Sequence, residues 1–220
     1  MLASSSTIPF GSFWQNSTFQ DTVVSIKAPE IESPDWLVAQ EAAARQLSQQ
    51  PSPRVGGHMT ITYEVQTRGN ITANLAEFKH QANETLNDAR GWSRLNVSFR
   101  EVASGGHFTL VLSEASQVPS FSPGGCGAEY SCRVGRYVII NQDRWLGATP
   151  SWNNAGGSIR DYRHMVVNHE TGHWLGHGHS SCGGAGQPAP VMQQQSMNLQ
   201  GCTFNPWPLA GELRAPNIGR

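Results

Sequence analysis

Residues 169–179 read HETGHWLGHGH, which is the pattern H-E-x-x-H-x-x-G-x-x-H. The fold of the rest of the chain has to position the side chains of this stretch. On a helix, His169 and His173 lie on the same face one turn apart, so both imidazoles can reach one metal ion. Glu170 is offset from that face, close enough to contact a metal-bound water without binding the metal itself. The pair of histidines and the carboxylate together indicate metal-assisted hydrolysis.

The second half of the motif supplies a third ligand. Gly176 can adopt the left-handed conformation that ends a helix, so the chain can turn back and bring His179 to the metal. Three protein ligands leave one coordination position for water, which is the arrangement of a catalytic zinc site rather than a structural one. We therefore expect one catalytic Zn²⁺. An accidental histidine-rich surface helix would have to place five residues at fixed offsets by chance.

The other histidines lack ligand spacing. His177 lies between two glycines, and we expect it to be exposed or hydrogen-bonded rather than a ligand. Ordinary surface or core roles are expected for the rest, namely His58, His80, His107 and His164.

The residues before the motif predict the helix that carries it. Ser158, with Asp161 three positions on, is a capping-box pattern at a helix start. Ile159, Tyr162, Val166, His169 and His173 then follow a three-to-four-residue period, which predicts a buried stripe beneath the ligands. We expect a helix over residues 159–175.

Upstream, the periodicity predicts a mixed arrangement of helices and strands. We expect helices at 36–50 and 71–90 and strands at 58–67, 95–101, 107–113 and 136–141, with a hairpin-like turn at 104–106 joining the second and third strands. Residues 114–135 form a loop too long for a simple turn. It either covers a sheet edge or shapes one end of a substrate cleft.

The extended motif resembles the signature of the metzincin clan of zinc endopeptidases, which is followed by a methionine-containing turn. The segment APVMQQQ (189–195) is the candidate for that turn, with Met192 beneath the zinc; an ordinary core methionine is the alternative. In some metzincins a tyrosine just after this methionine is an extra ligand. Here Gln193, Gln194, Gln195 and Ser196 follow, so no tyrosine ligand is expected.

Three other blocks of the sequence resemble a bacterial domain family of unknown function, DUF3152, whose members are metzincin-like and secreted or membrane-anchored. The blocks are YVIINQDRWLG (137–147), DYRHMVVNHE (161–170) and NPWPL (205–209). The resemblance implies an α+β, metzincin-like (zincin) fold, with a twisted mixed sheet, an active-site helix and a small irregular C-terminal subdomain. We expect an N-terminal extension with a short helix at 1–55 and a catalytic domain at 56–220, divided into an upper (56–178) and a lower (179–220) subdomain.

Four cysteines allow three pairings. Cys126 and Cys132 enclose a short loop, while Cys182 and Cys202 flank the methionine segment, so we predict the disulfides Cys126–Cys132 and Cys182–Cys202. A second metal site that combines Cys182 with His177 is the competing interpretation, but no C-x-x-C spacing supports it. Disulfides require an oxidising compartment.

Composition limits the possible partners. The chain has 220 residues and a formal net charge of −1, which gives no reason to expect binding to nucleic acid or to an anionic membrane surface. No apolar run approaches transmembrane length. We expect an extracellular monomer acting on a peptide or protein substrate. Because residues 1–6 do not resemble a signal peptide, any export signal or upstream membrane anchor is expected to be missing from this sequence.

These features predict a zinc-dependent endopeptidase in which Glu170 is the general base. Hydrolysis of a non-protein amide or ester would use the same residues. A zinc-stabilised binding or surface module without turnover is a second alternative, although such a module has no need of Glu170. A third alternative is that the N-terminal arm is a pro-segment that the protein itself cleaves. We disfavour this alternative because the arm offers no evident ligand for the zinc.

Overall fold

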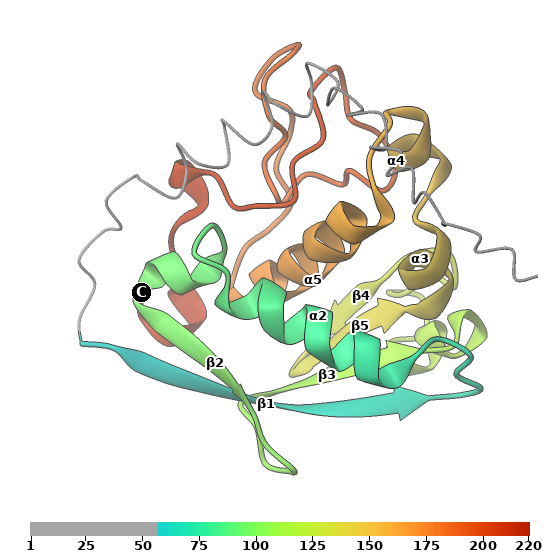
Figure 1. Cartoon of the computed structure of the whole chain (residues 1–220), viewed down its shortest axis with the longest axis vertical. Coiled ribbons are helices and arrows are strands. Elements are labelled where there is room, and N and C mark those ends of the chain that lie inside the picture. The colour runs from blue at the N-terminus through green and yellow to red at the C-terminus, as the bar shows by residue number, and fades with distance from the viewer. Residues whose placement is uncertain (1–56) are drawn as a thin grey trace, which may run out of the picture. The chain divides into compact units, whose positions relative to one another are not determined.

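The computed structural model describes residues 57–220, so the expected extension at 1–55 and the helix at 36–50 lie outside the described residues. Five strands form one sheet in the order β2-β1-β3-β5-β4 (Figure 1). Their bounds are β1 Met59–Arg68, β2 Val97–Glu101, β3 Phe108–Ser113, β4 Cys132–Val134 and β5 Tyr137–Asn141. The strands β2, β1, β3 and β5 run parallel, and β4 is antiparallel to β5.

Alternation along the strands divides the sheet into an inner and an outer face. The inner face carries apolar side chains, all fully buried, from β1, β3 and β5: Ile61, Tyr63, Phe108, Leu110, Leu112, Val138 and Ile140. These belong to the main core, beneath α2 and α5. The outer face carries a smaller cluster around Val111 and Ile139, which Val118 and Cys126 cover. Each fully buried large aliphatic side chain contributes about 1.5–3 kcal/mol to folding.

Two long helices begin at side-chain caps. Helix α2 spans Leu75–Asn87, and the Asn74 side chain accepts from the amides of Ala76 and Glu77. Helix α5 spans Ile159–Leu175, and Ser158 accepts from the Asp161 amide. The predicted bounds of the motif-bearing helix are therefore confirmed. Its buried stripe begins one turn later than expected, because Ile159 is 37% exposed whereas Tyr162 is fully buried.

The predicted hairpin between β2 and β3 is wrong. Both strands pair in parallel with β1, on opposite sides: Tyr63 is the partner of Glu101 in β2 and of Phe108 in β3. The connection therefore crosses over β1 instead of reversing. Gly106 makes this possible, since a Cβ there would lie 2.7 Å from the Tyr63 Cα. The Gly105 amide donates to Glu64 Oε2 at 2.7 Å and fixes the crossing.

The remaining elements are short. They are η1 Trp92–Leu95, η2 Ala115–Phe121, α3 Gln142–Gly147, α4 Pro150–Asn154, η3 Ala210–Glu212 and η4 Pro216–Ile218. The expected loop at 114–135 thus contains η2 and the whole of β4. Between α5 and η3 the described chain is irregular. The predicted α+β class, with a twisted mixed sheet, an active-site helix and an irregular C-terminal segment, is confirmed. In residues 57–220 no helix combines the length and apolarity that crossing a membrane needs.

A buried histidine joins both long helices to the C-terminal segment. Thr85 in α2 donates to the Gln81 carbonyl oxygen, so its hydroxyl oxygen accepts from His164 Nδ1 at 2.8 Å. The His164 ring also packs on Trp207, with ring centroids 4.9 Å apart. Desolvation, followed by the nearby charge of Arg160, lowers the pKa of His164 to about 4. His164 is therefore a core residue, one of the two roles expected for it.

Replacing Gly106 with alanine should destabilise the protein. The added Cβ meets the Tyr63 and Glu64 backbone, which cannot rotate away, and overpacking of this kind costs about 1–3 kcal/mol. Urea denaturation of Gly106→Ala measures the loss. Gly57→Ala is the matched control, because a Cβ there meets nothing within 4 Å. Equal stability of the two variants would contradict the crossing geometry.

Acid should weaken the fold through His164. Its folded pKa of about 4 lies below its ordinary value of 6.5, so its contribution is complete above pH 6.5 and is lost as the pH falls through 4. The loss amounts to about 2–3 kcal/mol at most. In His164→Gln the free energy of unfolding should depend less on pH in that window. A wild-type slope retained in the variant would rule His164 out as its origin.

Candidate metal centre

Three histidine side chains converge at the C-terminal end of α5. The Nε2 atom of His173 lies 3.1 Å from that of His169 and 3.1 Å from that of His179. His169 and His173 project from α5 one turn apart, and His179 arrives from the segment after the helix. These residues are also the group of potential metal ligands found among residues 57–220. The three histidines of the sequence motif therefore lie together in the structure.

The tautomers of two rings follow from their backbone partners. The Nδ1 atom of His169 lies 2.8 Å from the Val191 carbonyl oxygen, and that of His173 lies 2.9 Å from the His177 carbonyl oxygen. A carbonyl oxygen can only accept, so each Nδ1 carries the proton and each Nε2 presents a lone pair. Such second contacts orient metal-binding histidines. The site thus fits a zinc ion, and His169, His173 and His179 would hold it.

Burial favours the neutral form of the three imidazole rings, and metal binding requires that form. Desolvation, followed by the neighbouring His173, lowers the pKa of His169 to about 3. Desolvation is also the largest cause of the lowered pKa of His173 and of His179.

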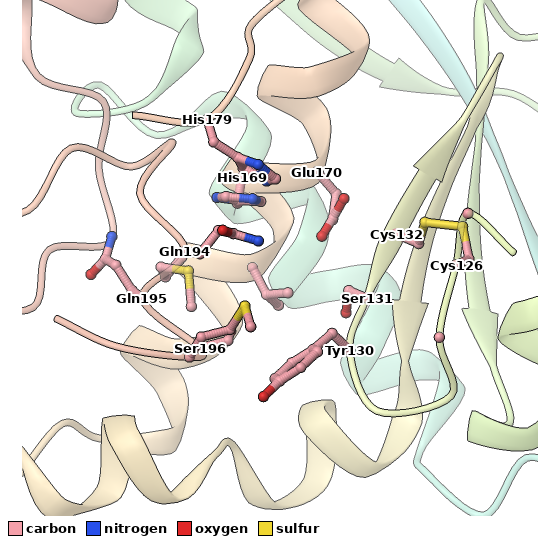
Figure 2. Close-up of a pocket in the computed structure, with 15 residues that line it drawn as sticks. Cys126, Tyr130, Ser131, Cys132, His169, Glu170, His179, Gln194, Gln195 and Ser196 are labelled. Carbon is pink, nitrogen blue, oxygen red and sulfur yellow. A yellow bond between two sulfur atoms is a disulfide. The ribbon is translucent and has the colours of Figure 1, made fainter. Parts of the chain in front are cut away.

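Glu170 lies beside the three rings. It is 5% exposed, and desolvation raises the pKa of its carboxyl to about 8. Within the described chain its side chain has no hydrogen-bond or ion-pair partner. Figure 2 shows it between the histidine rings and the wall formed by the Cys126–Cys132 disulfide. The carboxyl group of Glu170 therefore lies at the cavity and makes no hydrogen bond or ion pair that would stabilise the fold.

The methionine segment packs directly beneath the ligands. Met192 is fully buried, and its Sδ lies where a Cβ on Gly172 of α5 would be. Its neighbour Val191 provides the carbonyl oxygen that orients His169. Gly172 therefore lets the methionine approach the helix backbone, and this segment is the structural candidate for the metzincin-type turn.

Glu212 holds this segment in place and was missed in the sequence. Its carboxylate accepts from the amides of Val191, Met192 and Leu209 at 3.0, 2.9 and 2.8 Å. Burial raises its pKa, against the lowering effect of these amides. Its contact with Leu209 is local, but the two amides of the methionine segment that it binds lie about twenty residues away along the chain, so the sequence does not mark this role.

The turn that delivers His179 is tied to the same segment. Gly176 has φ 109°, and the His177 amide donates to the Gly172 carbonyl oxygen. His177 is buried, lies 2.7 Å from the Arg214 carbonyl oxygen through Nε2, and packs on Trp92. It is hydrogen-bonded, as expected for a residue outside the ligand set. The Ser180 amide donates to the Met192 carbonyl oxygen at 3.0 Å.

Both predicted disulfides are present in the structure. Cys182–Cys202 joins the start of the irregular segment to its later part, with Cα atoms 5.7 Å apart. Cys126–Cys132 closes the loop before β4, with Cα atoms 6.0 Å apart. The first therefore braces the segment that carries Met192.

A cavity of about 240 Å³ opens beside the metal ligands (Figure 2). One wall is the disulfide loop, with Tyr130 and Ser131. The floor is α5, through Met165 and Val166, and the opposite wall is residues 194–197. Within the loop expected at 114–135, Val118 and Cys126 cover the outer face of the sheet, and residues 125–127 and 130–132 line the cavity.

Replacing Gly172 with alanine should weaken zinc binding as well as the fold. The Cβ would displace Met192 and with it Val191, the partner of His169, and overpacking costs about 1–3 kcal/mol. Zinc affinity is measured by competition with a chromophoric chelator. Gly147→Ala, where a Cβ meets nothing within 4 Å, is the control and should keep wild-type affinity. Unchanged affinity in Gly172→Ala would contradict the proposed support.

Comparison with known proteins gives a family but no established activity. A search of curated proteins found no match. Among solved structures, archaemetzincin from Methanopyrus kandleri matches with 16% sequence identity and a TM-score of 0.41, over 76% of this chain and 99% of that one. The model of the family described as "Protein of unknown function (DUF3152)" matches residues 37–206. This chain belongs to the DUF3152 family.

Proposed function

We propose that this protein is a zinc-dependent endopeptidase. The observation that carries the proposal is the convergence of three histidine Nε2 atoms beside a buried carboxyl group that the fold does not use. A structural zinc site needs four protein ligands and no free acid-base group. Here a fourth position is left for water, with Glu170 next to it.

A zinc ion bound at this site would polarise a substrate carbonyl group and make a water molecule acidic enough to attack it near neutral pH. His169, His173 and His179 would bind that ion through Nε2. The backbone carbonyl groups of Val191 and His177 keep two of these rings in the required orientation.

Glu170 moves the proton. Its carboxylate accepts the proton of the attacking water and returns it to the nitrogen of the leaving amine. Burial raises the pKa of this carboxyl in the chain alone, whereas the positive charge of a bound zinc ion would lower it, so that the carboxylate form would be available as the base. No ion pair competes for it in the described part of the chain.

The surroundings favour a peptide as the substrate. Strand β4 is the last strand of the sheet beside the cavity and pairs with β5 alone among the described strands. An extended peptide could pair with its free edge through backbone hydrogen bonds. The cavity next to Glu170 would then receive one substrate side chain, between Tyr130 and Met165.

We also propose a location, an oligomeric state and a domain division for the protein. Both disulfides are compatible with an extracellular protein, and we propose that it acts there as a monomer. Residues 56–220 would form the catalytic domain, with the cleft between an upper (56–178) and a lower (179–220) subdomain.

Glu170→Gln should retain one zinc ion and lose turnover by at least about 10²–10⁴-fold, because it keeps the shape of the side chain but cannot accept the proton. Digestion of a peptide library, analysed by mass spectrometry, measures turnover, and elemental analysis measures zinc. Glu84→Gln, at a half-exposed position of α2 where the carboxylate pairs with Arg160, should cleave normally. Undiminished cleavage by Glu170→Gln would refute the mechanism.

A further inference from the structure

Arg133, the middle residue of β4, faces the metal-bearing helix. Its neighbours Cys132 and Val134 pack on the outer-face cluster, and side chains alternate between faces along a strand. In the register of the sheet, Arg133 pairs with Val138, which belongs to the inner core. The guanidinium therefore lies on the α5 side of the sheet, at its last strand.

The fold gives this guanidinium no partner. Its Nε is buried and makes no hydrogen bond, and among residues 57–220 no carboxylate forms an ion pair with it. The other buried or partly buried arginines have partners for their guanidinium groups. Arg163 pairs with Glu77 and Arg90 with Asp88. Arg94 and Arg144 have no ion pair within the described chain, but each donates to a backbone carbonyl oxygen, of Pro208 and Ala148 respectively. A partly buried positive charge without a counter-charge is costly to keep. Arg133 thus carries a recognition group that the fold itself leaves unused.

Arg133 lies next to the cavity that opens beside the three histidines. Cys132, the preceding residue, lines the cavity together with His169, Glu170 and His179. Arg133 itself is not among the residues that line this cavity. Its side chain therefore lies next to the cavity, on the α5 side of the sheet and outside the cavity lining.

We propose that Arg133 is a specificity-determining residue that binds a carboxylate of the peptide substrate, next to the cavity beside the three histidines. This inference rests on the proposed endopeptidase function. A peptide paired with the β4 edge would pass Arg133, whose neighbour Cys132 lines the cavity together with His169 and Glu170. The guanidinium fork matches a carboxylate in geometry and charge. The carboxylate comes from an Asp or Glu side chain or from the end of the peptide chain.

The test uses zinc-loaded full-length protein carrying Glu170→Gln, so that binding is measured without cleavage. The probes are three fluorescent peptide pools with random flanking residues: one with a central Glu and an amidated end, one with Gln and an amidated end, and one with Gln and a free carboxylate. Fluorescence anisotropy gives the affinity for each pool. The Glu pool or the free-carboxylate pool should bind about 10- to 100-fold more tightly than the neutral pool.

Variants of Arg133 identify the cause. Arg133→Gln should abolish the preference while leaving affinity for the neutral pool near its starting value, and Arg133→Lys should keep part of it. Arg100→Gln, at an exposed site on β2 at the opposite edge of the sheet, removes the same charge and should keep the preference. Melting temperatures show that each variant is folded.

Three results would overturn the proposal: equal affinity for all pools, a preference that survives Arg133→Gln, or an equal loss of affinity for every pool in that variant. Cleavage of the same pools by protein with Glu170 intact separates the two claims. No cleavage at all would count against the endopeptidase function, whereas cleavage without an Arg133-dependent acidic preference would count against this inference alone.

Discussion

Two hydrogen bonds to backbone carbonyl oxygens orient two of the three histidines that we propose as zinc ligands. His169 donates through Nδ1 to Val191, and His173 donates through Nδ1 to His177. Without them each ring could rotate or carry its proton on Nε2, and the convergence of the three lone pairs would be lost. The His177 carbonyl oxygen comes from the turn at Gly176, which is part of the motif. The Val191 carbonyl oxygen comes from a distant segment, so the site depends on tertiary structure.

That distant segment is held from several directions. Met192 packs on the bare backbone of Gly172, Glu212 accepts from the amides of Val191 and Met192, and Ser180 donates to the Met192 carbonyl oxygen. The disulfide Cys182–Cys202 closes the loop around it. A segment without helix or strand has few backbone hydrogen bonds of its own, and these contacts replace them. Rigidity at the metal therefore originates largely in the irregular part of the chain.

Features with local causes could be predicted from the sequence. The bounds of α5 follow from the Ser158 cap and from Gly176. The convergence of His169 and His173 follows from helical spacing, and that of His179 from the turn at Gly176. The path between β2 and β3 could not, because a Ser-Gly-Gly turn suits a hairpin as well as a crossing, and pairing with β1 decides between them. Likewise, β4 has three residues, too few to show a period. The roles of Glu212 and Arg133 depend on register and long-range contacts that no sequence window contains.

The most direct test of the central claim is the zinc K-edge X-ray absorption spectrum of the purified full-length protein, together with its metal content. Our account predicts one zinc ion per chain with three imidazole nitrogens and one water oxygen, at about 2.0–2.1 Å. His179→Ala should reduce the number of imidazole ligands by one. Sulfur scattering at about 2.3 Å, or a protein that takes up no zinc, would contradict the account.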